Sequence, residues 1–315
     1  MVDECVEVEK TVTNSVLPDW VRVLPPETSG LGERKSFLRK QEAKEVLKMF
    51  TDDPELQVVW VEAPWGGGKT SFIQDGGWDL QAPVRIVRLD GKKFTSDESG
   101  DTISLIEKDI DLSNYFQVVL IDSGDWIFVP SSELLGRRLP SFSDCQTTPS
   151  SDKKALNEYL DRLDNLRRLK KASTMAKRVN SRTCLVMTRH FQHWLVTMTD
   201  PLLQGKFNRI FPARNQGRYQ LGSYSQESAR DFLLTRKFDD SALIQLLLER
   251  EETREHGFLK GLSQETFDYL AEALQKGEND LVNRALNILI DQRKKYQFIG
   301  HRLDNKGNIL IDSQA

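Results

Sequence analysis

The chain has 315 residues, of which 38% are hydrophobic, 29% charged and 9% aromatic. This composition predicts a buried core divided between about two domains, and it excludes a disordered or fibrous protein. Lys and Arg number 44 against 47 Asp and Glu, so the surface as a whole is not built to coat nucleic acid, and any basic surface must be local.

Targeting and membrane signals are missing from the sequence. No apolar run approaches the roughly 18 to 20 residues that a membrane helix needs, and residues 1–10 are acidic and carry no apolar segment. The three cysteines, Cys5, Cys145 and Cys184, lie far apart, which argues against disulfides and thiolate metal sites. We therefore expect a cytoplasmic protein that makes no membrane contact.

The first 55 residues predict an N-terminal extension and a leading helix. Apolar residues recur at helical spacing from about residue 34 to 50. From residue 56 the pattern changes to short β-branched runs at 56–63, 84–89, 116–122 and 183–188. Because continuous apolar runs suit strands covered on both faces, they predict an α/β fold with a parallel sheet flanked by helices, spanning 56–222.

An insertion is expected at about 128–182. Residues 131–152 are rich in Ser, Thr, Pro and Asp and predict an irregular loop. Residues 153–182 predict a helix, and they form the most basic segment of the chain. Such a segment is usually the solvated face of a helix, and the alternative is a surface that contacts DNA phosphates or an acidic partner.

The chain after Ser225 predicts an all-helical lid domain over 223–296. Helices are expected at about 226–237, 241–256, 263–276 and 280–295, with Ser225 and Ser263 as N-caps of the first and third. Residues 297–315 hold two short apolar runs around an Asn-Lys-Gly-Asn sequence, which predicts a C-terminal hairpin or tail.

The strongest motif is a glycine-rich loop that follows the first strand. Its pattern is that of a phosphate-binding P-loop, with Ala63 in place of the first glycine. Glycines let backbone N–H groups curl around an anion, Lys69 reaches the β and γ phosphates, and the Thr70 hydroxyl binds Mg²⁺. The alternative is a glycine-rich turn with a chance Lys-Thr. The predicted cofactor-binding residues here are Pro64, Trp65, Gly66, Gly67, Gly68, Lys69, Thr70 and Ser71.

A second element of such a site is an apolar strand that ends in a metal-side carboxylate. Residues 118–122 supply it, ending in Asp122. Asp125 is the candidate for orienting or deprotonating an attacking water, and the alternative is a surface turn acid. Ser123 follows Asp122 where a glutamate would favour hydrolysis.

Four further residues are catalytic candidates. Thr188 and Arg189 end the fourth strand, where a polar group would sense the γ-phosphate. Arg209 and Arg214 precede a short extended segment at 218–221, and either is a candidate to reach the nucleotide of a neighbouring subunit. The alternative for both is an ordinary arginine at the surface or in contact with the lid.

Together these residues resemble the AAA+ and STAND superfamilies of P-loop ATPases over about residues 30–295. Gly32-Glu33-Arg34 is similar to their entry motif, which places Arg34 near adenine, and residues 122–125 resemble the hhhhDxxD motif of STAND proteins. Thr188-Arg189 resembles their sensor-1 pair, residues 219–225 resemble the step into the lid, and residues 65–72 resemble the KAP loop. Asn283 occupies the position of the sensor-2 arginine, with Arg284 one residue out of place.

The resemblance implies an ATPase that uses ATP and Mg²⁺ and self-associates when nucleotide is bound. No Asn-Lys-x-Asp motif is present to read guanine, which favours ATP over GTP. Three settings stay open: action on DNA through 153–182, as in replication or transposition; an antiviral or signalling STAND ATPase that needs a protein partner; and a nucleotide-gated scaffold with little turnover.

Overall fold

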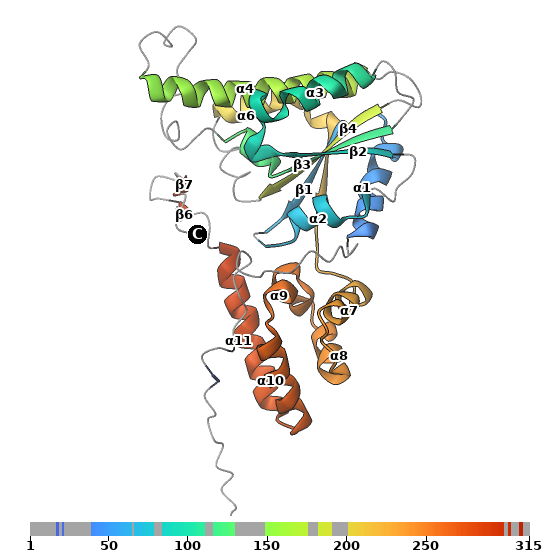
Figure 1. The fold of residues 1–315 in the computed structure, drawn as a ribbon, viewed down its shortest axis with the longest axis vertical. Coiled ribbons are helices and arrows are strands. Elements are labelled where there is room, and N and C mark those ends of the chain that lie inside the picture. Colours follow the sequence, from blue (N-terminus) through green and yellow to red (C-terminus); the bar gives the residue numbers. More distant parts are fainter. Residues whose placement is uncertain are drawn as a thin grey trace, which may run out of the picture.

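The computed structural model (Figure 1) describes most of the chain. The described residues are 17–18, 21, 39–64, 66–78, 84–110, 116–129, 149–175, 182–190, 201–298, 302–303 and 309–310. Helix α1 spans Lys40–Asp52 and buries Val46 and Phe50. The expected start of this helix at Arg34 lies outside the described residues.

A five-stranded parallel sheet forms the centre of the core. Its strands are β1 (Val58–Ala63), β2 (Val84–Asp90), β3 (Phe116–Asp122), β4 (Arg182–His190) and β5 (Gln216–Gln220). Their order is β2-β3-β4-β1-β5, and all neighbours are parallel. The predicted α/β fold and its four main strands are confirmed. Because the strands are parallel, the carboxyl ends of β1, β3 and β4 meet at one edge.

Helices cover both faces of this sheet, as Figure 1 shows. Side chains alternate between the faces along each strand. Val58 and Trp60 pack with α3 (Ser96–Ile110), α4 (Ser150–Met175) and α6 (Pro201–Ile210). Val59 and Val61 pack with α1 and with α2 (Lys69–Asp75) on the opposite face. Two apolar layers therefore hold the carboxyl edge of the sheet in place.

Helix α4 contains most of the basic segment predicted at 153–182, and the helix is confirmed for its described part. One face of α4 is buried against the sheet through Tyr159, Leu163, Leu166 and Leu169. Arg162 lies on that face and donates to the carbonyl oxygens of Trp126 (2.6 Å) and Val129 (3.2 Å). Arg168 donates to both carboxylate oxygens of Glu107, at 3.2 and 2.7 Å. Arg162 and Arg168 therefore support the fold, while Lys154, Arg167 and Lys171 are exposed.

The helical C-terminal region lies beneath the α1 and α2 face in Figure 1. Its helices are α7 (Gln226–Thr235), α8 (Ser241–Glu249), α9 (His256–Gly261), α10 (Gln264–Gln275) and α11 (Asn279–Phe298). Both predicted N-caps are confirmed: the Ser225 hydroxyl accepts from the Ser228 N–H and the Ser263 hydroxyl from the Thr266 N–H, each at 3.1 Å. The domain limits at residues 55, 222 and 296 stay predictions.

The single helix expected over 241–256 is wrong. Helix α8 ends at Glu249, where Arg250 adopts an extended conformation. The Thr253 hydroxyl then donates to the carbonyl oxygens of Leu247 and Arg250, which occupies carbonyls that a continuing helix would use. The chain makes a short 3-10 turn (Glu252–Arg254) and begins again as α9 at His256.

Two short strands follow α11. β6 (Arg302–Leu303) and β7 (Ile309–Leu310) pair antiparallel, as predicted for a hairpin. Within the part of the chain that the structure describes, every helix is too short or too polar to traverse a lipid bilayer.

Candidate functional site

The glycine-rich loop connects β1 to α2 at the carboxyl edge of the sheet. Gly66 and Gly68 have φ angles of 67° and 85°, a left-handed region that strongly favours glycine. A Cβ atom on Gly67 would lie 2.7 Å from the Ala63 Cβ, so a larger residue would push the loop away from the strand. The three glycines are therefore required by the turn itself. Trp65 lies outside the described residues.

Lys69 begins α2 directly after this loop. Its Nζ donates to the carbonyl oxygens of Ala63 (2.8 Å) and Pro64 (3.0 Å). Burial lowers the pKa of Lys69 to about 8, against the opposing effect of the nearby Asp125 and Asp122 carboxylates. A half-buried ammonium group in the curve of a glycine loop is suited to bind an anion, because its charge is only partly solvated without one.

Asp122 and Thr188 lie side by side where β3 and β4 end. The Thr188 hydroxyl donates to Asp122 Oδ1 at 2.9 Å. The Ser123 N–H lies 2.7 Å from Thr188 Oγ1 and 3.0 Å from Asp122 Oδ1. Thr188 is fully buried, so these contacts fix the orientation of the Asp122 carboxylate. Ser123 reaches this geometry with a left-handed φ of 53°.

Asp125 lies in the short helix η3 (Gly124–Ile127) that follows this turn. The residue is only 3% exposed, which excludes the alternative of a surface turn acid. The carboxylate acts on Lys69 more strongly than Asp122 does. Lys69, Asp122, Asp125 and Thr188 are thus brought together from the ends of three strands, β1, β3 and β4.

Oxygen atoms at this edge suit a hard divalent cation. Thr70 lies in the first turn of α2 and is exposed, and Asp122 presents a carboxylate oriented by Thr188. Hydroxyl and carboxylate oxygens are the ligands that Mg²⁺ prefers, together with water and substrate phosphates. Thr70 and Asp122 would leave the remaining positions around such an ion to phosphate and water. Among the described residues, no group of three or more His, Cys, Asp or Glu side chains forms a metal cluster.

The predicted arginines are placed apart from this group. Arg189 points to the sheet face opposite Thr188, where it pairs with Glu62 and lies 5.2 Å from the Trp60 ring. Burial, together with the nearby charge of Arg218, lowers the pKa of Arg189 to about 9. Its guanidinium therefore neutralises Glu62 rather than facing the glycine loop. Arg209 and Arg214 are exposed. Arg214 precedes β5, so it lies at the amino ends of the strands, opposite the carboxyl edge that holds the glycine loop.

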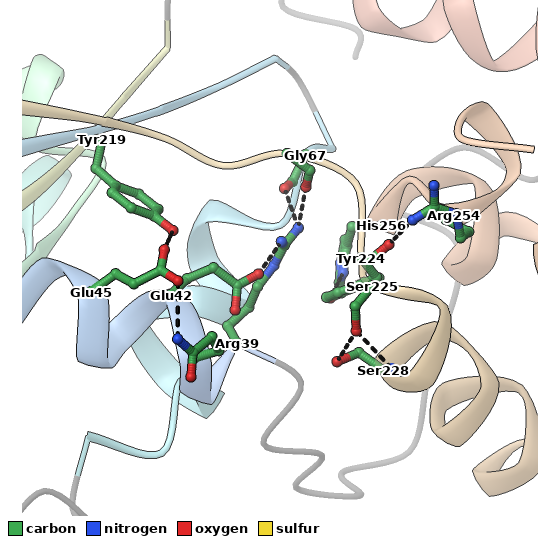
Figure 2. Close-up of polar contacts among 12 residues, drawn as sticks. Arg39, Glu42, Glu45, Gly67, Tyr219, Tyr224, Ser225, Ser228, Arg254 and His256 are labelled. Carbon is green, nitrogen blue, oxygen red and sulfur yellow. Dashed lines mark hydrogen bonds and ion pairs between the residues drawn. The ribbon is translucent and has the colours of Figure 1, made fainter.

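Three residues that the sequence did not predict lie against the glycine loop. Arg39 donates to the carbonyl oxygens of Gly222 (3.0 Å) and Gly67 (3.5 Å) and pairs with Glu42 at 2.6 Å. Figure 2 shows the Arg39 side chain directed at Gly67. His256 is buried beside Gly68, and Tyr224 lies between it and Arg39.

A fourth residue of this kind is Arg293 of α11. Its guanidinium carbon would lie 2.2 Å from a Cβ atom on Gly257, and its charge opposes the protonation of Lys69. The expected sensor-2 positions lie elsewhere: the Asn283 side chain accepts from Arg250 at 2.7 Å, and Arg284 is exposed. The lid therefore presents a buried arginine toward the loop, well beyond Arg284 along the same helix.

His256 predicts a pH dependence of stability. Burial, with the charges of Arg39, Lys260 and Arg293, lowers its pKa from 6.5 to about 3. Between these values only the unfolded chain binds the proton, so acid favours unfolding. We expect the free energy of unfolding to fall by up to about 1.4 kcal/mol per pH unit below about pH 6.5 from this residue alone.

Denaturant unfolding of wild type and His256→Gln at about pH 7, 6, 5 and 4 measures this slope. The difference in the free energy of unfolding between the two proteins should shrink as the pH falls, because wild type loses stability and the glutamine cannot titrate. Parallel pH profiles for the two proteins would show that His256 does not resist protonation.

Comparison with known proteins adds little to this geometry. No protein-family model matches the chain, and no curated protein sequence matches it. This chain is similar to the solved structure of a RuvB mutant from Thermotoga maritima, with 14% sequence identity and a TM-score of 0.38. The alignment covers 80% of this chain and 73% of the RuvB chain. The assignment of the fold therefore rests on the sheet order and on the glycine loop at the end of β1.

Proposed function

We propose that this chain binds ATP with Mg²⁺ at residues 64–71 and hydrolyses it, acting as a molecular switch of the AAA+ or STAND kind. The observation that supports this most is the half-buried Lys69 ammonium, which a three-glycine loop holds near the carboxylates of Asp125 and Asp122. ATP is preferred to GTP because the sequence lacks a guanine-reading motif. Titration with Mg-ATP and Mg-GTP, followed by measurement of released phosphate, tests binding and turnover separately.

Each residue at this edge has a role in the proposed reaction. The backbone N–H groups of the loop and the Lys69 ammonium would bind the β and γ phosphates. Thr70 and Asp122 would hold Mg²⁺, which neutralises charge on the phosphates. Thr188 keeps Asp122 in position through their 2.9 Å hydrogen bond. Asp125 would orient the attacking water and accept its proton.

The lid supplies the conformational part of the switch. Arg293 reaches the neighbourhood of Lys69 from α11, so a triphosphate would draw this arginine and its helix toward the core. Loss of the γ-phosphate would weaken that attraction. Phosphate release near zero in the wild type, despite tight binding, would favour the alternative of a nucleotide-gated scaffold, in which Ser123 marks lost turnover.

Self-association is the next part of the proposal. Arg209 ends α6 on an exposed surface, where it is available to a neighbouring molecule. We expect the molar mass in solution to rise when Mg²⁺ and a slowly hydrolysed ATP analogue are added, and we expect Arg209→Ala to reduce the turnover of the assembled protein by about 10³-fold or more. Light scattering with phosphate release measures both.

Arg230→Ala, which changes an exposed arginine on α7, is the matched control. A mass that does not change with nucleotide would contradict the assembly. Arg214→Ala tests the second exposed candidate in the same assay.

Contact with DNA is the second candidate function. Its support is the set of solvent-accessible cations Lys154, Arg167 and Lys171 on α4, while Arg162 and Arg168 are engaged in the fold. Salt-sensitive binding of duplex DNA that disappears when the three accessible residues are changed to Glu would favour it. If no binding is seen at low salt, an antiviral or signalling role with a protein partner is preferred.

A further inference from the structure

The lid touches the glycine loop through the imidazole of His256. This residue is the first of α9, and its ring lies 2.9 Å from the place where a Cβ atom on Gly68 would stand. Its Nε2 lies 3.4 Å from the Ser71 hydroxyl oxygen on α2. Gly68 and Ser71 flank Lys69 and Thr70, so the imidazole lies directly beside the proposed phosphate site.

Tyr224 holds this imidazole from the side of the lid. Its hydroxyl lies 2.7 Å from His256 Nδ1. The Tyr224 N–H donates to the Arg254 carbonyl oxygen at 3.0 Å, and the Arg254 guanidinium donates to the Tyr224 carbonyl oxygen. Figure 2 shows Tyr224 beside His256 and bound to Arg254. Tyr224 and His256 therefore belong to one rigid part of the lid.

Arg39 stacks on the same tyrosine from the core. Its guanidinium carbon lies 4.1 Å from the centre of the Tyr224 ring, a geometry that is attractive for a cation over an aromatic face. Arg39 also donates to Gly222 and Gly67. The side chain of Tyr224 is thus fixed on both sides, with its hydroxyl directed at His256.

The neutral imidazole allows two directions for these contacts, and one of them leaves a hydrogen-bond donor for an anion. His256 is neutral above its pKa of about 3, so one ring nitrogen donates and the other accepts. If the Tyr224 hydroxyl donates to Nδ1, then Nε2–H donates to the Ser71 oxygen. The Ser71 hydroxyl hydrogen is then left to donate to an oxygen of a bound anion.

We propose that Tyr224, His256 and Ser71 form a hydrogen-bond chain that links the lid to the nucleotide phosphate bound at Ser71. We take this phosphate to be one that ADP retains. Nucleotide binding and lid docking then stabilise each other through the chain. Tyr224 and His256 are positioning residues, and this inference rests on the proposed function.

Binding of Mg-ADP to single and double variants tests the chain. Tyr224→Phe removes only the hydroxyl and keeps the ring on which Arg39 stacks. We expect it to weaken binding by about 3- to 10-fold, and Ser71→Ala to do the same. Both changes break the same hydrogen-bond chain. The affinity of the double variant for Mg-ADP should therefore be no more than about twofold below that of the single variant that binds less tightly.

Tyr219→Phe is the matched control. It removes a tyrosine hydroxyl that donates a hydrogen bond to Glu45 at 2.6 Å. Tyr219 lies five residues before Tyr224 and takes no part in the hydrogen-bond chain, as Figure 2 shows. Its Mg-ADP affinity should stay within about twofold of wild type. Hydrogen exchange adds an independent measurement: saturating Mg-ADP should protect the amides of residues 256–261 in wild type and in the control, and not in Tyr224→Phe.

The possible results separate this inference from the function on which it rests. If wild type binds Mg-ADP and Tyr224→Phe behaves as the control does, the chain is refuted and the nucleotide site stands. Tighter binding by Tyr224→Phe would also refute it, because His256 would then compete with the phosphate for Ser71. If wild type binds neither Mg-ADP nor Mg-ATP, both proposals fail.

Discussion

Lys69→Ala is expected to weaken Mg-ATP binding by about 100-fold or more. The side chain supplies the positive charge of the glycine loop, and charged hydrogen bonds to phosphate oxygens are among the strongest that proteins make. The fold should not suffer, since burial already lowers the pKa of Lys69 to about 8 and so disfavours its charged form. Removing this half-buried charge therefore relieves a desolvation cost while it removes the anion site.

Calorimetric titration of wild type and Lys69→Ala with Mg-ATP measures this loss, and a thermal melt shows whether the variant is folded. Lys48→Ala, which changes an exposed lysine on α1, is the matched control and should bind as wild type does. Equal affinity of Lys69→Ala and wild type would refute the proposed phosphate site.

Asp125→Asn is expected to separate binding from turnover. The amide keeps the shape of the carboxylate but cannot accept a proton, so phosphate release should fall by about 10²- to 10⁴-fold. Affinity for Mg-ATP should change little or rise, because the loop residues that hold the phosphates remain and a negative charge near them is removed.

The control for this experiment is Asp122→Asn. If Asp122 holds Mg²⁺, its variant should need more Mg²⁺ for half-maximal turnover, whereas Asp125→Asn should show an unchanged Mg²⁺ requirement. Full turnover by Asp125→Asn would show that another group activates the water.

The strands and the glycine loop could be predicted from the sequence because their signals are local. Residues 118–122 form a continuous apolar run, which suits a strand covered on both faces. The spacing of Gly68, Lys69 and Thr70 is fixed by the turn that they form. Once the strands are parallel, Asp122 and Thr188 must end at the same edge, so their proximity follows from topology.

The lid side of the site could not be predicted, because it depends on contacts between distant segments. His256 reaches Gly68 only because Thr253 ends α8 and redirects the chain. Arg39 reaches Gly67 and Gly222, which lie 28 and 183 residues away along the chain. No local pattern encodes either contact.

Two charged residues carried a signal that periodicity could have found. Arg293 continues the buried stripe of Val282, Leu286 and Leu289 on α11, and a cation at a buried helical position points to a site or a structural partner. Arg162 lies likewise between Tyr159 and Leu163 on the buried face of α4. Because Arg162 faces the core, the charge along 153–182 is larger than the charge that α4 presents to solvent.

A crystal structure of the protein grown with Mg²⁺ and a slowly hydrolysed ATP analogue tests the central claim most directly. The account predicts polyphosphate oxygens within hydrogen-bond distance of the backbone N–H groups of residues 66–70 and of Lys69 Nζ, with the Thr70 hydroxyl on the metal and Asp122 beside it. A nucleotide bound elsewhere, or a glycine loop that holds no phosphate at saturating analogue, would contradict it.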